Sequence, residues 1–276
     1  MQSALMYLVP FVLSLALAGA LRFFVGAERG ARAAGVAVVV GFLAPWGIFL
    51  KPGWMHADDF VRMGHIAFGA GLAGFILDAW APRRLWAAIV AGVVILVSTW
   101  ASLNGSLRLH GPVDVEVIAA VVVLSVGAFL ILARLDAARE RGGTALVLLI
   151  MATLGLTVMA AVVGDMRLTI SGAMLAAALL ALALLQGFVG LPSGDAVILG
   201  GGGIVLALAW ALGHGQPDAR LGLLLVPLVL FAEGTAQRVS LPKARISMLL
   251  GPLVLAGVAA LPLILAIIVV YVMAHA

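Results

Sequence analysis

Ten apolar stretches, separated by short polar segments, constrain the fold of this chain more than any other feature. A helix needs about 20 predominantly apolar residues to cross the hydrocarbon core of a bilayer. Most of the stretches come close to that length and carry almost no charge. They lie at residues 5–21, 33–50, 64–80, 85–103, 117–132, 145–164, 170–191, 196–212, 221–236 and 246–273. The sequence therefore predicts an all-α protein, a polytopic bundle of about ten transmembrane helices.

The composition supports a membrane protein and excludes several other classes. Of the 276 residues, 64% are hydrophobic and 10% are charged, and the mean hydropathy is +1.24. A soluble domain contains about 25% charged residues and could not cover this much apolar surface. Sixteen basic and twelve acidic residues leave a net charge of +4, too little to indicate nucleic acid as a partner. The chain has no cysteine, which excludes disulfides and thiolate chemistry.

The loops predict the orientation of the bundle. Eleven of the 16 basic residues fall in the loops of one side and five in the loops of the other. Loops rich in Lys and Arg face the cytoplasm, so both termini are predicted to be periplasmic, in a bacterial inner membrane. Every loop is short, and we expect residues 1–276 to form a single integral membrane domain with no soluble domain.

Three polar residues within the apolar stretches are candidates for an ion or substrate site, because charged groups at membrane depth are costly and often functional. Glu233 is the deepest acid and lies one helical turn from Gln237. Asp78 ends the third stretch, and Gln186 lies well inside the seventh. The alternatives are that Glu233 marks a helix end near the interface and that Gln186 bridges two helices.

Four consecutive glycines at residues 200–203 interrupt the eighth stretch. Each glycine costs a helix about 1 kcal/mol relative to alanine. The run, including Gly200 and Gly201, could mark a broken helix that touches a ligand head group. It could equally form a flat face for close helix packing.

The five histidines and the carboxylates on the same side could bind Zn²⁺ or relay protons, although their spacing gives this little support. All five lie on the side that is predicted to be periplasmic, in loops, at the start of the third stretch or at the C-terminus, and they form neither an H-x-x-x-H nor an H-x-H pair. Polar residues of this kind collect in aqueous loops without any special role.

Several segments resemble, in the same order, the motifs of one family of membrane enzymes. Residues 34–42 are similar to the family's G-G-x-A segment. Residues 74–78, which are followed by Pro-Arg-Arg-Leu at residues 82–85, are similar to its G-F-x-D-D motif, which precedes a basic loop. Residues 227–238 are similar to its P-x-x-D…R stretch. Residues 134–146 and 199–203 fall where that family has N-x-x-D-G-x-D-G-L-A and F-x-G-D-x-G-S. The chain thus resembles the polyprenyl-phosphate N-acetylhexosamine-1-phosphate transferases, which include the phospho-N-acetylmuramoyl-pentapeptide transferases.

The resemblance implies a bundle that transfers a sugar-1-phosphate from a UDP-sugar to a lipid phosphate at a cytoplasmic site, with Mg²⁺ as cofactor. It implies substrate-binding positions near the cytoplasmic helix ends, and we take Gln186 and Glu233 as further candidates. The positions that the resemblance supplies are Asp78, Arg83, Arg84, Asp136, Gly200 and Gly201.

The chain departs from the family pattern at its acidic residues. Leu77 stands in place of the first Asp of the pair, and Gly201 stands where the family has a metal-binding Asp. Residues 136–143 replace the D-G-x-D-G segment, although Asp136 remains. Phosphoryl transfer needs carboxylates that hold Mg²⁺, so we expect Mg²⁺ only if transferase activity is retained.

These observations lead to one hypothesis and two alternatives. The chain is interpreted as a non-catalytic (pseudoenzyme) or altered relative that holds a lipid phosphate such as polyprenyl phosphate, or a partner protein. One alternative is a secondary transporter of a small metabolite, with Glu233, Asp78 and Gln186 in a central cavity. The other is a structural subunit of a membrane complex. Membrane lipids, and in the last case other membrane subunits, are the expected partners.

Overall fold

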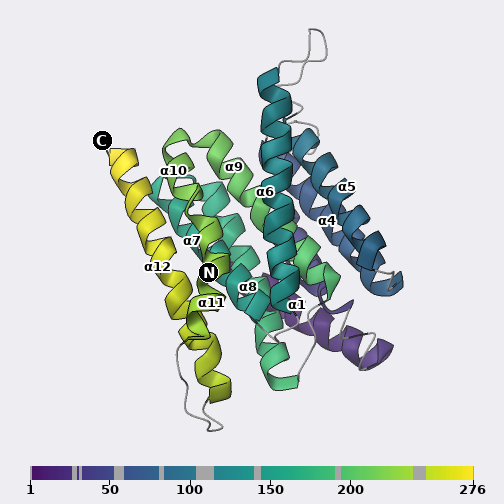
Figure 1. The fold of residues 1–276 in the computed structure, drawn as a ribbon. Coiled ribbons are helices and arrows are strands. Elements are labelled where there is room, and N and C mark those ends of the chain that lie inside the picture. The colour runs from purple at the N-terminus through teal and green to yellow at the C-terminus, as the bar shows by residue number, and fades with distance from the viewer. Residues whose placement is uncertain are drawn as a thin grey trace.

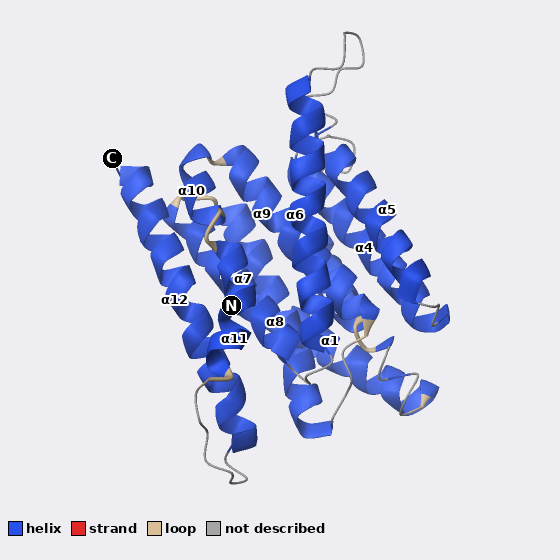
Figure 2. Ribbon diagram, in the orientation of Figure 1, coloured by secondary structure: helices blue, strands red, loops and turns tan. Residues whose placement is uncertain are grey.

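The computed structural model describes residues 2–26, 30, 33–52, 59–80, 84–103, 115–139, 144–189, 194–238 and 247–275. Every regular element in these ranges is a helix, and none of the described residues forms a strand (Figures 1 and 2). The prediction of an all-α bundle is confirmed.

Nine long helices follow the predicted apolar stretches within the described ranges. Figure 1 shows α12 at one flank of the bundle and α4 with α5 at the opposite flank. The nine helices are α1 (Gln2–Val25), α3 (Val36–Leu50), α4 (Asp59–Trp80), α5 (Arg84–Leu103), α6 (Val115–Arg139), α7 (Thr144–Val162), α8 (Met166–Val189), α9 (Gly202–Gly215) and α12 (Ser247–His275).

The helices are long and apolar enough for a multi-pass membrane protein. Among the described residues, seven helical segments could cross a membrane by length and hydropathy, and α3 and residues 89–99 of α5 are shorter apolar helical segments. The 15 residues of α3 span about 22 Å at 1.5 Å per residue. The chain is therefore an integral membrane protein with several spans, while the number of ten spans remains a prediction.

The polar turn between α7 and α8 shows how local sequence ends one helix and starts the next. Gly164 has a φ of 78°, a left-handed conformation that glycine adopts without the steric penalty of a Cβ. The N–H of the next residue, Asp165, donates to Ala160 O at 2.9 Å, and the Asp165 carboxylate accepts from Leu168 N at 3.0 Å. This turn brings α7 and α8 together as packed antiparallel neighbours.

Two of the predicted spans are irregular. The eighth begins with a π-helix, η1 (Ala196–Gly201), that leads into α9. The ninth, predicted as one helix over residues 221–236, is instead a series of short pieces. These are the 3-10 helix η2 (Pro217–Ala219), α10 (Arg220–Leu223), the 3-10 helix η3 (Val226–Phe231) and α11 (Ala232–Ala236).

Pro227 explains why the ninth span is not a regular α-helix. It stands in the first turn of η3 and has no N–H to donate, and in a regular α-helix its ring would clash with the carbonyl one turn earlier. The backbone around it uses tighter i→i+3 bonds, such as Leu228 N to Leu225 O at 3.1 Å. The hydropathy pattern predicts that this segment is apolar, but it does not reveal this local geometry.

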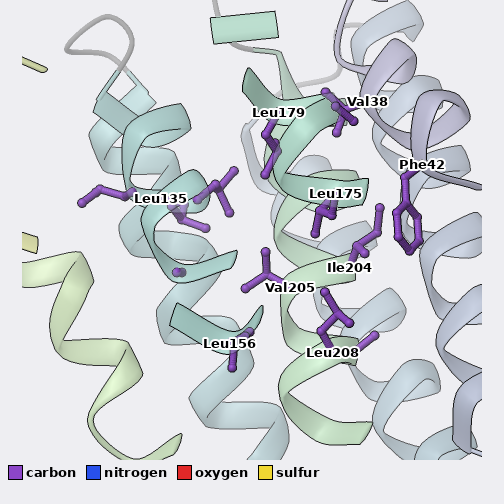
Figure 3. Close-up of a cluster of buried hydrophobic side chains, with 14 of the residues drawn as sticks. Val38, Phe42, Leu135, Leu156, Leu175, Leu179, Ile204, Val205 and Leu208 are labelled. Carbon is purple, nitrogen blue, oxygen red and sulfur yellow. The ribbon is translucent and has the colours of Figure 1, made fainter. Parts of the chain in front are cut away.

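The centre of the bundle is built around η1 and α9. Within residues 196–215, 78% of the most apolar 18-residue window is buried inside the protein, whereas the corresponding share for α1 is 17%. Figure 3 shows Ile204, Val205 and Leu208 of α9 among buried side chains of α3, α6, α7 and α8. The glycine run (Gly200–Gly203) therefore lies in the most deeply buried of the candidate spans.

Candidate functional site

Asp78 joins two parts of the chain that are far apart in sequence. It lies near the end of α4, is half-buried, and both of its carboxylate oxygens accept hydrogen bonds from backbone N–H groups. Asp195 N donates to Oδ1 at 2.7 Å and Ala196 N donates to Oδ2 at 2.8 Å. The end of α4 and the start of η1 therefore meet on the same side of the bundle.

The chemistry of a helix start accounts for this contact, which we call the Asp78 cap. The first N–H groups of a helix have no partner inside the helix, and a carboxylate placed there is also favoured by the helix dipole. The residue in the N-cap position, Asp195, makes no such bond with its own side chain. Asp78 supplies the missing acceptor from a neighbouring helix, so its carboxylate has a structural role.

Glycines on both sides of the Asp78 cap allow the backbones to approach closely. A Cβ at Gly74 of α4 would lie 2.6 Å from Ala196 Cα, and a Cβ at Gly35 would lie 2.6 Å from Val197 N. Both of these neighbours are backbone atoms of η1. Small residues at these two positions are therefore required by the packing of η1 against α4 and the start of α3.

The glycine run is surrounded by hydrocarbon. A Cβ at Gly200 would lie 2.5 Å from Val39 Cγ2, and a Cβ at Gly203 would lie 2.7 Å from Ala70 Cβ. Gly201 and Gly202 face other helices, and all four glycines are buried. The side chains that these two meet are Leu132, Leu135, Leu149 and Leu179. The arrangement agrees with the packing alternative that the sequence left open.

The other positions that the resemblance supplies are more scattered. Arg83 lies outside the described residues, and only the backbone of Arg84, which begins α5, is described. Asp136 is exposed on α6, one residue from Leu135, which packs against the glycine run. Gln186 is half-buried near the end of α8. The described structure thus brings Asp78 together with the segment that holds Gly200 and Gly201.

Glu233 is buried in the first turn of α11, where 4% of its surface is exposed. Gln237, one helical turn later, donates from Nε2 to Glu233 Oε1 at 3.1 Å. α11 packs mainly against α12 and η3, whereas α8, which carries Gln186, packs mainly against α1, α7 and α3. The two residues therefore belong to different packing layers of the bundle.

Arg134 is a polar feature that sequence reasoning missed. The predicted fifth span ends at residue 132 and leaves Arg134 in a loop, but α6 continues to Arg139, so this residue lies within the helix. Its guanidinium carbon lies 5.6 Å from the centre of the Phe231 ring in η3, a cation–π contact worth about 0.5–2 kcal/mol. The apolar residues Leu132 and Leu135 on either side were the signal that α6 continues.

The buried Nε of Arg134 has no hydrogen-bond acceptor in the described part of the chain. A buried donor without a partner is unfavourable, and in native structures such groups usually have a bound water, ion or ligand. The aromatic ring stabilises the charge but accepts no strong hydrogen bond from Nε. Arg134 therefore marks a position where an external anion would be favourable.

The resemblance implies a Mg²⁺ site, and the described acids can be compared with what that ion requires. Magnesium prefers an octahedral set of oxygen ligands that includes one or two carboxylates. No three His, Asp or Glu residues of the described ranges gather in a group that could hold a metal ion. The Asp78 carboxylate, the candidate that the resemblance would place at the metal, already accepts two backbone N–H groups.

No family model matches this chain, and no curated protein matches it. Its classification as a multi-pass membrane protein rests on its apolar helices and on the bundle that they form. The resemblance to the transferases stays a prediction.

Proposed function

We propose that this membrane protein binds a phosphate-bearing lipid and does not catalyse the transfer of a sugar phosphate. The Asp78 cap is the observation that carries the non-catalytic part of the proposal. Both oxygens of the acid that the resemblance places at the catalytic centre accept N–H groups of η1 at 2.7 and 2.8 Å. An acid used in this way stabilises helix packing instead of holding a metal ion.

The glycine run supports the same proposal. In the transferases that the chain resembles, a metal-binding Asp would stand at the position of Gly201, which offers no side-chain oxygen. Gly201 is buried between Leu179 and Leu149, whose nearest side-chain carbons lie 3.4 and 3.6 Å from its ideal Cβ position. Hydrocarbon surroundings cannot replace carboxylates that balance the charge of phosphates and metal. A lipid phosphate can still bind to basic side chains without that machinery.

We expect no metal-dependent formation of a lipid-linked sugar by the purified protein. The assay combines the full chain in lipid nanodiscs with labelled UDP-N-acetylhexosamine, undecaprenyl phosphate and Mg²⁺ or Mn²⁺. The physical reason is that Asp78, the acid at the site, is occupied by backbone donors. Product that depends on the metal and disappears in Asp78→Asn would overturn the non-catalytic part of the proposal.

We also propose that both termini lie in the periplasm of a bacterium and that the chain crosses its inner membrane ten times. The support is the eleven-to-five division of basic residues between the two sets of loops. A reporter fused after His275 should report a periplasmic location. A reporter inserted near Arg139 should report a cytoplasmic location. A cytoplasmic reporter at His275 would contradict either the orientation or the even number of spans, and the reporter near Arg139 would show which of the two is wrong.

A further inference from the structure

The position of Arg134 on α6 is unusual for a charged side chain. It lies five residues before Arg139, the last residue of α6, and this separation corresponds to about 7.5 Å along the helix axis. It is half-buried, and its Nε is enclosed without an acceptor in the described part of the chain. Arginines near the membrane ends of helices direct their charge toward the interface, where phosphates lie.

The surface beside Arg134 is apolar and open. Phe231 of η3, which lies next to the guanidinium, is 61% exposed. Leu130 precedes Arg134 by four residues on α6 and therefore shares its face, and Leu130 is 62% exposed. Leu228 precedes Phe231 by three residues on the 3-10 helix, shares its face in the same way, and is also exposed. Because α6 packs against η3, these residues form one patch, the Arg134 patch.

We propose that the Arg134 patch binds a single membrane phospholipid, with the phosphate on the Arg134 guanidinium and an acyl chain over Leu130 and Leu228. This inference rests on the proposed function, since it names the site and the lipid class that the proposal requires. The guanidinium supplies N–H donors in a planar fork that matches phosphate oxygens. The exposed leucines supply a hydrocarbon surface toward the membrane interior.

A lipid fits the Arg134 patch better than a soluble anion. The cation lies beside exposed leucines and a phenylalanine, which face hydrocarbon in a membrane protein. A phospholipid brings its phosphate and its acyl chain to such a surface together, whereas free phosphate would have to leave water. Asp136, the nearest acid in sequence, is exposed and lies two residues further along α6, a spacing that places it on another face.

The test measures lipid binding to the full chain by native mass spectrometry in detergent. The probes are phosphatidylglycerol, undecaprenyl phosphate, diacylglycerol as a lipid without phosphate, and millimolar inorganic phosphate as a competitor. We expect one retained phosphatidylglycerol on the wild-type protein, no retained diacylglycerol, and no displacement by inorganic phosphate. Arg134→Gln should weaken phosphatidylglycerol binding by about tenfold, as expected for the loss of a hydrogen bond to a charged group.

Two further variants separate the site from general effects on the protein. Arg167 also faces an aromatic ring, with its guanidinium carbon 5.9 Å from the centre of Phe60, but Arg167 is exposed. Arg167→Gln should therefore bind the lipid like the wild type, and Arg134→Lys, which keeps the charge, should bind more tightly than Arg134→Gln. The two Arg134 variants should elute from size-exclusion chromatography as the wild type does.

The outcomes distinguish this inference from the proposed function. If the wild type retains phosphatidylglycerol and Arg134→Gln retains it equally well, the Arg134 patch is wrong while lipid binding stands. If the wild type retains neither phosphatidylglycerol nor undecaprenyl phosphate, the proposed function fails as well. Displacement of the lipid by inorganic phosphate would overturn the assignment of the patch to a lipid.

Discussion

Asp78→Ala is expected to lower the free energy of unfolding by about 3 kcal/mol, because it removes two hydrogen bonds to a charged acceptor and the cap of a helix. Asp195 N and Ala196 N would then have no acceptor from α4. Both donors lie at the start of η1, which leads into the most deeply buried span. The measurement is equilibrium unfolding in mixed micelles with increasing SDS, followed by tryptophan fluorescence.

Two comparisons make the Asp78 prediction specific. Asp78→Asn keeps one oxygen acceptor but places an amide donor against the other N–H, so about half of the loss is expected. Asp218→Ala removes an exposed acid of η2 and should change the free energy by less than about 0.5 kcal/mol. An Asp78→Ala variant as stable as Asp218→Ala would show that the cap contributes little.

Most of the helical architecture could be predicted from the sequence, because its signal is local. Residues 145–164 and 170–191 were expected to be helices, and α7 and α8 occupy nearly those ranges. A long apolar stretch in a membrane must satisfy its own backbone hydrogen bonds, and a helix is the simplest way to do so. Length and hydropathy are therefore enough to locate such elements.

The irregular backbone could be predicted only in part. The glycines at residues 200–203 indicated either a broken helix or close packing, and the structure shows a continuous π-helix that leads into α9 and makes close hydrocarbon contacts. Pro227 was visible inside the ninth stretch, but membrane helices often tolerate proline. Whether the backbone kinks, tightens into a 3-10 helix or stays regular depends on neighbours that no local pattern reveals.

The candidate site depends on contacts between distant residues, which explains why sequence reasoning found only some of it. Asp78 was singled out as an acid at membrane depth, but its partners lie 117 and 118 residues away in sequence. Arg134 was counted as a loop charge, because its contact with Phe231 joins residues that a local pattern cannot relate. Composition could identify polar residues, while their roles follow from tertiary packing.

The Asp78 cap and the glycine contacts act on the same junction. The cap fixes the start of η1 against the end of α4, and Gly74 lies one helical turn before Asp78 on α4. The hydrogen bonds can reach their short lengths only because the two backbones come close together. A side chain at Gly74 should therefore weaken the same junction that Asp78→Ala weakens, through steric repulsion.

Gly74→Ala is expected to destabilise the protein by about 3 kcal/mol or more, the upper range for an overpacked core. The new Cβ would lie 2.6 Å from Ala196 Cα, 2.9 Å from Asp195 O and 3.0 Å from Ala196 N. All three are backbone atoms, so no side chain can rotate away to relieve the clash. The expected result is a lower midpoint in SDS unfolding or, if the variant does not fold, little protein in the membrane fraction.

Gly69→Ala is the matched control on the same helix. No atom lies within 4 Å of a Cβ at Gly69 other than its own helix and chain neighbours, and the residue is exposed. Alanine favours a helix over glycine by about 1 kcal/mol, so this variant should accumulate normally and unfold at the wild-type midpoint or slightly above it. Because both variants add one methyl group to α4, their difference isolates the contact with η1. Equal midpoints for Gly74→Ala and Gly69→Ala would mean that the α4–η1 contact is loose enough to accept a side chain. The Asp78 hydrogen bonds would then have to form across a wider gap than the structure shows.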